Sequence, residues 1–122
     1  MNKPLKEKVI VVSGGTKGVG KTISEEFAKA GAKVVIGGRD EDAARKSIKI
    51  IKTYGSEAIF VHTDLEKVED CKKLFDEAAN KFGKIDGFFI YAGVTPLSPV
   101  DTCDQETFNQ VMNVNLRACF FC

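Results

Sequence analysis

The sequence predicts an α/β protein with a doubly wound parallel sheet in three layers, helices covering both faces of the sheet. Two observations predict this class: short β-branched runs alternate with segments whose apolar residues recur at helical spacing, and glycines cluster directly after the first run. A length of 122 residues, with 43% hydrophobic and 29% charged residues, is typical of one folded domain, which we expect to span residues 1–122.

The first half of the chain predicts two strands, each followed by a helix. The strands are expected at 8–14 (KVIVVSG) and 32–38 (AKVVIGG), because both runs are short and rich in Val and Ile. Gly31 and Gly55 are expected to end the helices, and Asp40 to cap the start of the second. The predicted buried stripes are Val19, Ile23, Phe27 and Ala30 in the first helix, and Ala44, Ile48, Ile51 and Tyr54 in the second.

The second half predicts two more strands, at 57–64 (EAIFVHTD) and 85–93 (IDGFFIYAG). The helix between them should end at Gly83, and a last helix is expected to start near Thr102 or Asp104 and to run to the end of the sequence. The predicted stripes are Val68, Cys71, Phe75, Ala78 and Phe82 in the third helix, and Phe108, Val111, Met112, Leu116, Cys119 and Phe120 in the last. This alternation predicts right-handed crossovers and the strand order 3-2-1-4.

Charge and hydropathy argue against two classes of partner. Eighteen basic and seventeen acidic residues give a net charge of +1, and the basic residues are scattered, which argues against nucleic acid. The basic N-terminal segment MNKPLKEK precedes only the short run VIVV, too short for a signal peptide or a membrane span. We therefore expect a cytoplasmic protein.

The cysteines and the single histidine predict no metal site. Cys119 and Cys122 form a C-x-x-C pair late in an apolar helix, where the helix dipole opposes thiolate formation, so two buried apolar side chains are favoured over a redox or zinc pair. His62 has no second histidine at ligand spacing.

Residues 11–20 (VVSGGTKGVG) place four glycines at the first strand-to-helix turn. A helix N-terminus at this position offers unpaired N–H groups and a positive dipole end to a phosphate, provided that side chains leave room. Gly14 is expected to allow a sharp exit from the strand, Gly18 the approach of a pyrophosphate, and Gly20 the close packing of the helix. The context predicts a Rossmann-type dinucleotide site, with a ligand-free turn as the alternative.

Residues 15–22 (GTKGVGKT) also match the P-loop pattern G-x-x-x-x-G-K-T. A P-loop hydrolase needs in addition an Mg²⁺-binding Asp at the end of an apolar strand. The fourth predicted strand ends without an acid, and Asp64 after the third is the only candidate. This alternative predicts Mg²⁺-dependent binding of ATP or GTP.

Four segments together resemble the classical short-chain dehydrogenase/reductase family over nearly the whole chain. They are SGGTKGVG at the family's T-G-x-x-x-G-x-G, HTDL at its adenine-site Asp, IDGFFIYAG at its D-x-L-V-N-N-A-G, and VMNVNLRACFF at its v-N-l stretch. The resemblance implies an oxidoreductase that moves a hydride between a nicotinamide and a small-molecule carbonyl or alcohol substrate. It also implies a homo-oligomer, either a dimer or a tetramer.

The end of the second strand predicts NADP(H) as the cofactor. Gly38 stands where NAD-binding members of the family usually carry an acid for the ribose 2′-OH, and the guanidinium of Arg39 can hold a 2′-phosphate with two hydrogen bonds. Lys17 in the glycine turn would add a second positive charge. The resemblance further implies cofactor contacts from Ser13, Gly14, Gly15, Thr16, Gly18, Val19 and Gly20 in the turn, from Asp64 and Leu65 at the adenine, and from Tyr91, Ala92 and Gly93 towards the nicotinamide.

The resemblance assigns proton transfer to a Tyr, a Lys four residues later, a Ser and an Asn. Asn115 matches the Asn, but Ala58 follows Tyr54 by four residues and Thr95 follows Tyr91 by four, so the chain has no Y-x-x-x-K.

A sheet ordered 3-2-1-4 would also leave its fourth strand as an apolar edge. We therefore expect the N-terminal half of a longer reductase, truncated before the Ser and Tyr-x-x-x-Lys segment and inactive alone. The alternative is a non-catalytic NADP(H)-binding module.

Overall fold

The computed structural model describes residues 3–16, 18–90 and 104–113. Strands and helices alternate along these residues, as predicted. They follow the order β1 (Val9–Ser13), α1 (Gly18–Lys29), β2 (Lys33–Gly38), α2 (Glu41–Thr53), β3 (Ala58–His62), α3 (Val68–Phe82), β4 (Gly87–Ile90) and α4 (Gln105–Val111). Each strand lies inside the range that the sequence predicts for it.

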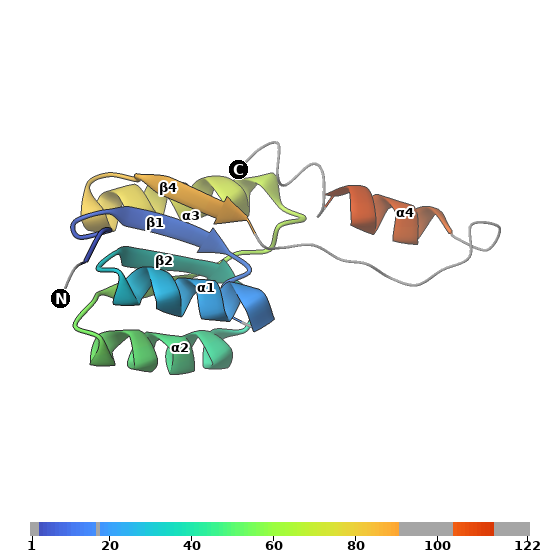
Figure 1. Cartoon of the computed structure of the whole chain (residues 1–122). Helices are drawn as coiled ribbons and strands as arrows, with labels where there is room; N and C mark the ends of the chain where they lie inside the picture. Colours follow the sequence, from blue (N-terminus) through green and yellow to red (C-terminus); the bar gives the residue numbers. More distant parts are fainter. Residues whose placement is uncertain (1–2, 17, 91–103, 114–122) are drawn as a thin grey trace.

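The four strands form one parallel sheet in the order β3-β2-β1-β4, which confirms the predicted topology. β1 lies in the middle, where Val11 is opposite Val35 of β2 and Phe88 of β4 (Figure 1). In a parallel sheet all carboxyl ends lie at the same edge. The ends of β1, β2 and β3, which carry most of the predicted cofactor contacts, are therefore neighbours.

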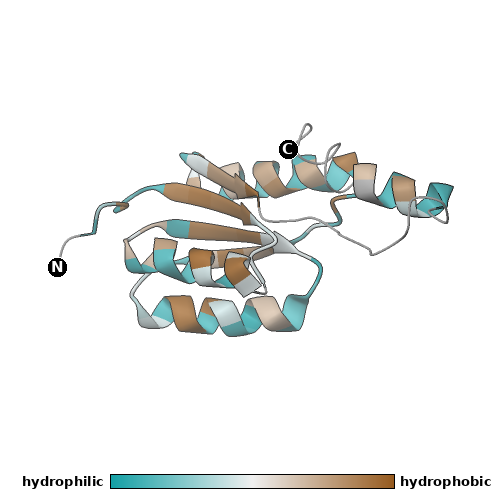
Figure 2. Cartoon of the chain, turned by 45° about the vertical axis from the view of Figure 1, so that its right-hand side comes forward, coloured by the Kyte–Doolittle hydropathy of each residue, from teal (hydrophilic) through white to brown (hydrophobic). Residues whose placement is uncertain are grey.

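The sheet is covered on both faces, α1 and α2 lying on one and α3 on the other (Figure 1). Because successive strand residues face opposite sides, β1 contributes Ile10 and Val12 to the first core and Val11 to the second. Strands buried on both faces are apolar at successive positions, and Figure 2 shows them as largely brown ribbons between helices of mixed colour.

The buried side of α1 differs in part from the predicted stripe. Its fully buried residues are Gly20, Ser24 and Ala28, whereas Val19, which the stripe includes, is 50% exposed. The helix packs so closely on the sheet that small residues occupy the contact. A buried stripe predicted from large apolar side chains does not include these small residues.

The buried side of α3 also needs a correction. Cys71 and Ala78 are buried as predicted, but Val68 is exposed, and Leu74, which the predicted stripe omits, is fully buried. Leu74 lies against Gly37 of β2, where an added Cβ would be 2.9 Å from Leu74 Cδ2. The strand glycine thus leaves the space that the Leu74 side chain occupies.

The start of α4 agrees with the prediction. Asp104 is its N-cap, and its carboxylate accepts a hydrogen bond from the N–H of Thr107 at 2.7 Å, which lowers the pKa of Asp104. Phe108 and Met112 from the predicted apolar face are exposed. The rest of the predicted helix, from residue 114, lies outside the described residues.

The amino ends of β1 and β4 are joined by a pair of hydrogen bonds. Val9 N–H donates to Asp86 Oδ2 at 2.8 Å, and Asp86 N–H donates to the carbonyl of Val9 at 2.8 Å. The Val9 hydrogen bond, followed by one from Lys84, lowers the pKa of the Asp86 carboxyl.

Within the described ranges, no helix combines the length and apolar character that a membrane crossing needs.

Candidate functional site

The glycine turn joins the carboxyl end of β1 to the first turn of α1. Gly14 has a φ of 80° and Gly18 a φ of 57°, conformations that residues with a side chain rarely adopt. The N–H of Gly14 donates to the carbonyl of Gly37 at 2.9 Å, which ties the turn to the end of β2. Gly14 therefore makes the sharp exit from the strand that the sequence predicts.

Gly15 and Gly20 are required for space rather than for their dihedral angles. A Cβ on Gly20 would collide with the carbonyl group of Gly14, and a Cβ on Gly15 would lie 2.8 Å from Ser24 Oγ. Ser24 is fully buried, and its hydroxyl donates to the carbonyl of Gly20 at 2.9 Å. The first turn of α1 thus lies directly against the glycine turn.

The outer side of the turn is open. A Cβ on Gly18 would meet no atom within 4 Å, and Gly18 and Val19 are both exposed. Ser13 and Thr16 are instead buried, at 1% and 8% exposure. A helix N-terminus whose approach is cleared in this way can hold an anionic group such as a pyrophosphate.

Gly38, the last residue of β2, lies beside the glycine turn. A Cβ there would be 3.2 Å from Thr16 Cγ2, so the end of β2 lies against the turn that follows β1. Arg39 follows Gly38 and is exposed. The Oδ1 of Asp40 accepts a hydrogen bond from the N–H of Ala43 at 3.0 Å, which confirms the prediction that Asp40 caps α2.

Asp64 and Leu65, in the loop after β3, are half-buried at the same edge of the sheet. The Oδ1 of Asp64 accepts a hydrogen bond from the N–H of Glu66 at 3.0 Å, and the Asp64 N–H donates to Asp70 Oδ2 at 2.9 Å. The sequence prediction omits Asp70, because a carboxylate in the first turn of a helix does not reveal which loop it contacts.

The lysine of the P-loop pattern does not reach back over the turn. Lys21 Nζ lies 2.7 Å from Glu25 Oε1, one turn further along α1. Thr22 Oγ1 donates to the carbonyl of Gly18 at 3.3 Å. Among residues 3–16, 18–90 and 104–113, no group of three or more His, Cys, Asp or Glu side chains is placed to hold a metal ion.

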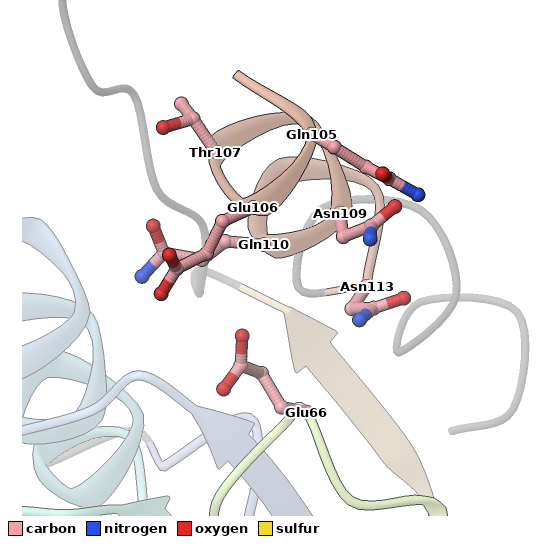
Figure 3. Close-up of a pocket in the computed structure, with 7 residues that line it drawn as sticks. All are labelled: Glu66, Gln105, Glu106, Thr107, Asn109, Gln110 and Asn113. Carbon is pink, nitrogen blue, oxygen red and sulfur yellow. The ribbon is translucent and has the colours of Figure 1, made fainter.

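A polar hollow of about 590 Å³ lies between Glu66 and one side of α4 (Figure 3). Figure 3 shows the Glu66 carboxylate directed towards the side of α4 that carries Glu106 and Gln110. The other lining residues, Gln105, Thr107, Asn109 and Asn113, bring mainly amide groups, which both donate and accept hydrogen bonds. The sequence prediction misses this hollow, because it joins segments far apart in the chain.

Five predicted site residues lie outside the described part of the chain. They are Lys17, Tyr91, Ala92, Gly93 and the predicted catalytic residue Asn115. The structure brings the other predicted contacts together from the ends of β1, β2 and β3 at one edge of the sheet.

Known proteins resemble this chain throughout its length. A family model described as short chain dehydrogenase matches residues 8–122. An uncharacterized oxidoreductase of Listeria monocytogenes is 36% identical over 113 residues, which cover 93% of this chain and 46% of that relative. The chain therefore spans about half the length of the curated relatives it matches.

Solved structures share the fold. A short chain dehydrogenase from Burkholderia cenocepacia in complex with NADP has a TM-score of 0.94 and 27% identity, over 97% of this chain and 49% of the other. An NADH-dependent reductase complexed with NAD has a TM-score of 0.91 and 26% identity, over 99% of this chain and 51% of the other. The family model, the strand order and the glycine turn agree, and the chain belongs to the short-chain dehydrogenase/reductase family.

Proposed function

We propose that residues 1–122 are the NADP(H)-binding part of an oxidoreductase that transfers a hydride between the nicotinamide and a small-molecule carbonyl or alcohol. The observation that carries the choice of cofactor is the end of β2, where Gly38 takes the position of an acidic side chain and the exposed Arg39 follows it. An acid there would bind the free 2′-OH of NAD, whereas a guanidinium binds a 2′-phosphate.

The glycine turn supports binding of the pyrophosphate. The open space at Gly18 would let the phosphates approach the N–H groups at the start of α1, and the absence of a side chain at Gly20 lets the helix begin against the carbonyl of Gly14. In the proposal, Ser13, Gly14, Gly15, Thr16 and Val19 complete this contact, and Lys17 adds a positive charge near the 2′-phosphate.

The remaining contacts follow the dinucleotide along the edge of the sheet. In the proposal, Asp64 and Leu65 would hold the adenine, and Tyr91, Ala92 and Gly93 would contact the nicotinamide side. The nicotinamide would supply the hydride, and Asn115 would support the water relay that returns a proton to the substrate oxygen. The two neighbours with bound NADP and NAD are consistent with a nicotinamide cofactor, and Arg39 favours the phosphorylated form.

The test is a fluorescence titration of the chain with NADPH and with NADH. We expect tighter binding of NADPH and, in Arg39→Ala, a loss of about tenfold or more in NADPH affinity with NADH affinity unchanged, because a charged hydrogen bond to phosphate is lost. Arg45→Ala is the matched control, since Arg45 is exposed on α2 and pairs with Glu41.

Three results would contradict parts of the proposal. Equal binding of NADPH and NADH by the unchanged chain would remove the role of Arg39, and Mg²⁺-dependent binding of ATP or GTP without binding of either dinucleotide would favour the P-loop alternative. If NADPH binds and a longer form of the protein reduces no carbonyl compound, the non-catalytic module is the better description.

A further inference from the structure

Three hydrogen bonds hold the backbone and side chain of Asp64. Its carboxylate accepts from Glu66 N–H at 3.0 Å, its carbonyl accepts from Lys67 N–H at 2.9 Å, and its own N–H donates to Asp70 Oδ2 at 2.9 Å. The first two are turn contacts between residues close in the sequence. The third is different, because it ties the loop to a side chain of α3.

Asp70 lies in the first turn of α3, where an acid usually serves the helix itself. Lys67, the N-cap of α3, makes no side-chain capping bond. The half-buried Asp70 carboxylate reaches past the N-cap and accepts from the N–H of Asp64 in the loop after β3. The backbone of the loop residue Asp64 is thus held by a residue of the helix.

We propose that Asp70 is a positioning residue for adenine recognition. This inference rests on the proposed function, in which the Asp64 carboxylate accepts a hydrogen bond from the exocyclic amine of adenine. Asp64 Oδ1 already accepts a hydrogen bond from Glu66 N–H, so the proposal assigns the contact with the adenine amine to Oδ2. By fixing the Asp64 N–H, Asp70 holds that carboxylate in place before the nucleotide arrives, and a preorganised group binds more tightly than one that must be ordered on binding.

The test compares two cofactors that differ at this amine and at the neighbouring ring nitrogen. NADPH carries adenine, and reduced nicotinamide hypoxanthine dinucleotide phosphate carries a carbonyl oxygen in place of the amine and a hydrogen on N1. A carboxylate attracts an N–H donor and repels a second acceptor. We therefore expect the unchanged chain to bind NADPH several-fold more tightly than the hypoxanthine analogue, as measured by nucleotide fluorescence.

Asp70→Ser removes the contact, because the serine hydroxyl is one bond closer to the backbone and remains compatible with a first helical turn. We expect NADPH affinity to fall about fivefold and affinity for the hypoxanthine analogue to change less than about twofold. Asp70→Asn keeps an acceptor atom and should recover most of the loss. Glu69→Ser is the matched control, since it removes an exposed acid from the same turn of α3 and should leave both affinities unchanged.

The outcomes separate this inference from the proposed function. A chain that binds neither cofactor contradicts the proposed function, and the role of Asp70 fails with it. If NADPH binds but Asp70→Ser lowers both affinities equally, or lowers neither, the proposed function stands and the positioning role is overturned. Equal binding of the two cofactors by the unchanged chain also overturns it, because Asp64 then makes no contact with the amine.

Discussion

Gly20 lies so close to the carbonyl group of Gly14 that no methyl group fits between them. This contact fixes where α1 starts relative to the end of β1. It therefore links the stability of the domain to the shape of the proposed pyrophosphate site.

We predict that Gly20→Ala destabilises the chain by about 2–3 kcal/mol and abolishes NADPH binding, because the new methyl group forces backbone apart. Gly83→Ala is the control: Gly83 has a φ of 79° but open space around it, so the cost there is conformational and about 1 kcal/mol. Urea unfolding measures both. Equal losses would show that the contact between Gly20 and Gly14 is not the cause.

Gly38→Asp should reverse the preference between the two cofactors. The new carboxylate can accept from the ribose 2′-OH of NADH and repels the 2′-phosphate of NADPH, and its Cβ meets only the side chain of Thr16. We expect NADPH affinity to fall about tenfold or more while NADH affinity rises. Asn80→Asp adds the same charge on an exposed position of α3 and should change neither affinity, as cofactor titrations can check.

Leu74→Ala should cost about 2–5 kcal/mol of unfolding free energy, because Leu74 is fully buried in the core between α3 and the sheet. Val68→Ala on the same helix should cost about 0.5 kcal/mol or less, since Val68 is 37% exposed and lies outside the two cores. Denaturant unfolding of the two variants decides between the buried side observed in α3 and the stripe predicted from the sequence. A larger loss in Val68→Ala would favour the predicted stripe.

The pKa of Asp86 is lowered in the folded chain, mainly by the hydrogen bond from Val9 N–H. A lowered folded pKa contributes stability above the unfolded value, about 3.9, and this contribution is lost as the pH falls through the folded pKa. The stability difference between the wild type and Asp86→Asn should therefore be present at pH 7 and shrink below about pH 4. Urea unfolding across this range tests it, and a stability difference that is the same at both ends of the range would contradict it.

The topology could be predicted from the sequence, because β-branched runs, helical periodicity and the glycine turn all indicate the same arrangement. The two cores were harder to assign. Leu74 is buried because Gly37 leaves room opposite it, and Ser24 is buried because α1 touches the sheet, so both depend on contacts between elements. The apolar periodicity of one helix alone predicts neither burial.

The candidate site divides in the same way. Residues that act through their own backbone, such as Gly14 and Gly20, are visible in the spacing of the glycines. Asp70 and the residues around the polar hollow are not, because their roles depend on how a loop and a helix meet. Asn115 stays a prediction from the sequence.

The position of β1 has a consequence for how the protein is made. β1 leaves the ribosome before β2, β3 and β4, yet it lies between β2 and β4 in the sheet, and the hydrogen bond from Val9 to Asp86 joins residues 77 positions apart. Contacts at such long separation form slowly, because a long loop must close before they stabilise anything. Until β4 is synthesised, one side of a largely apolar strand lacks its partner, and a chaperone that shields this side of β1 would raise the yield of folded protein.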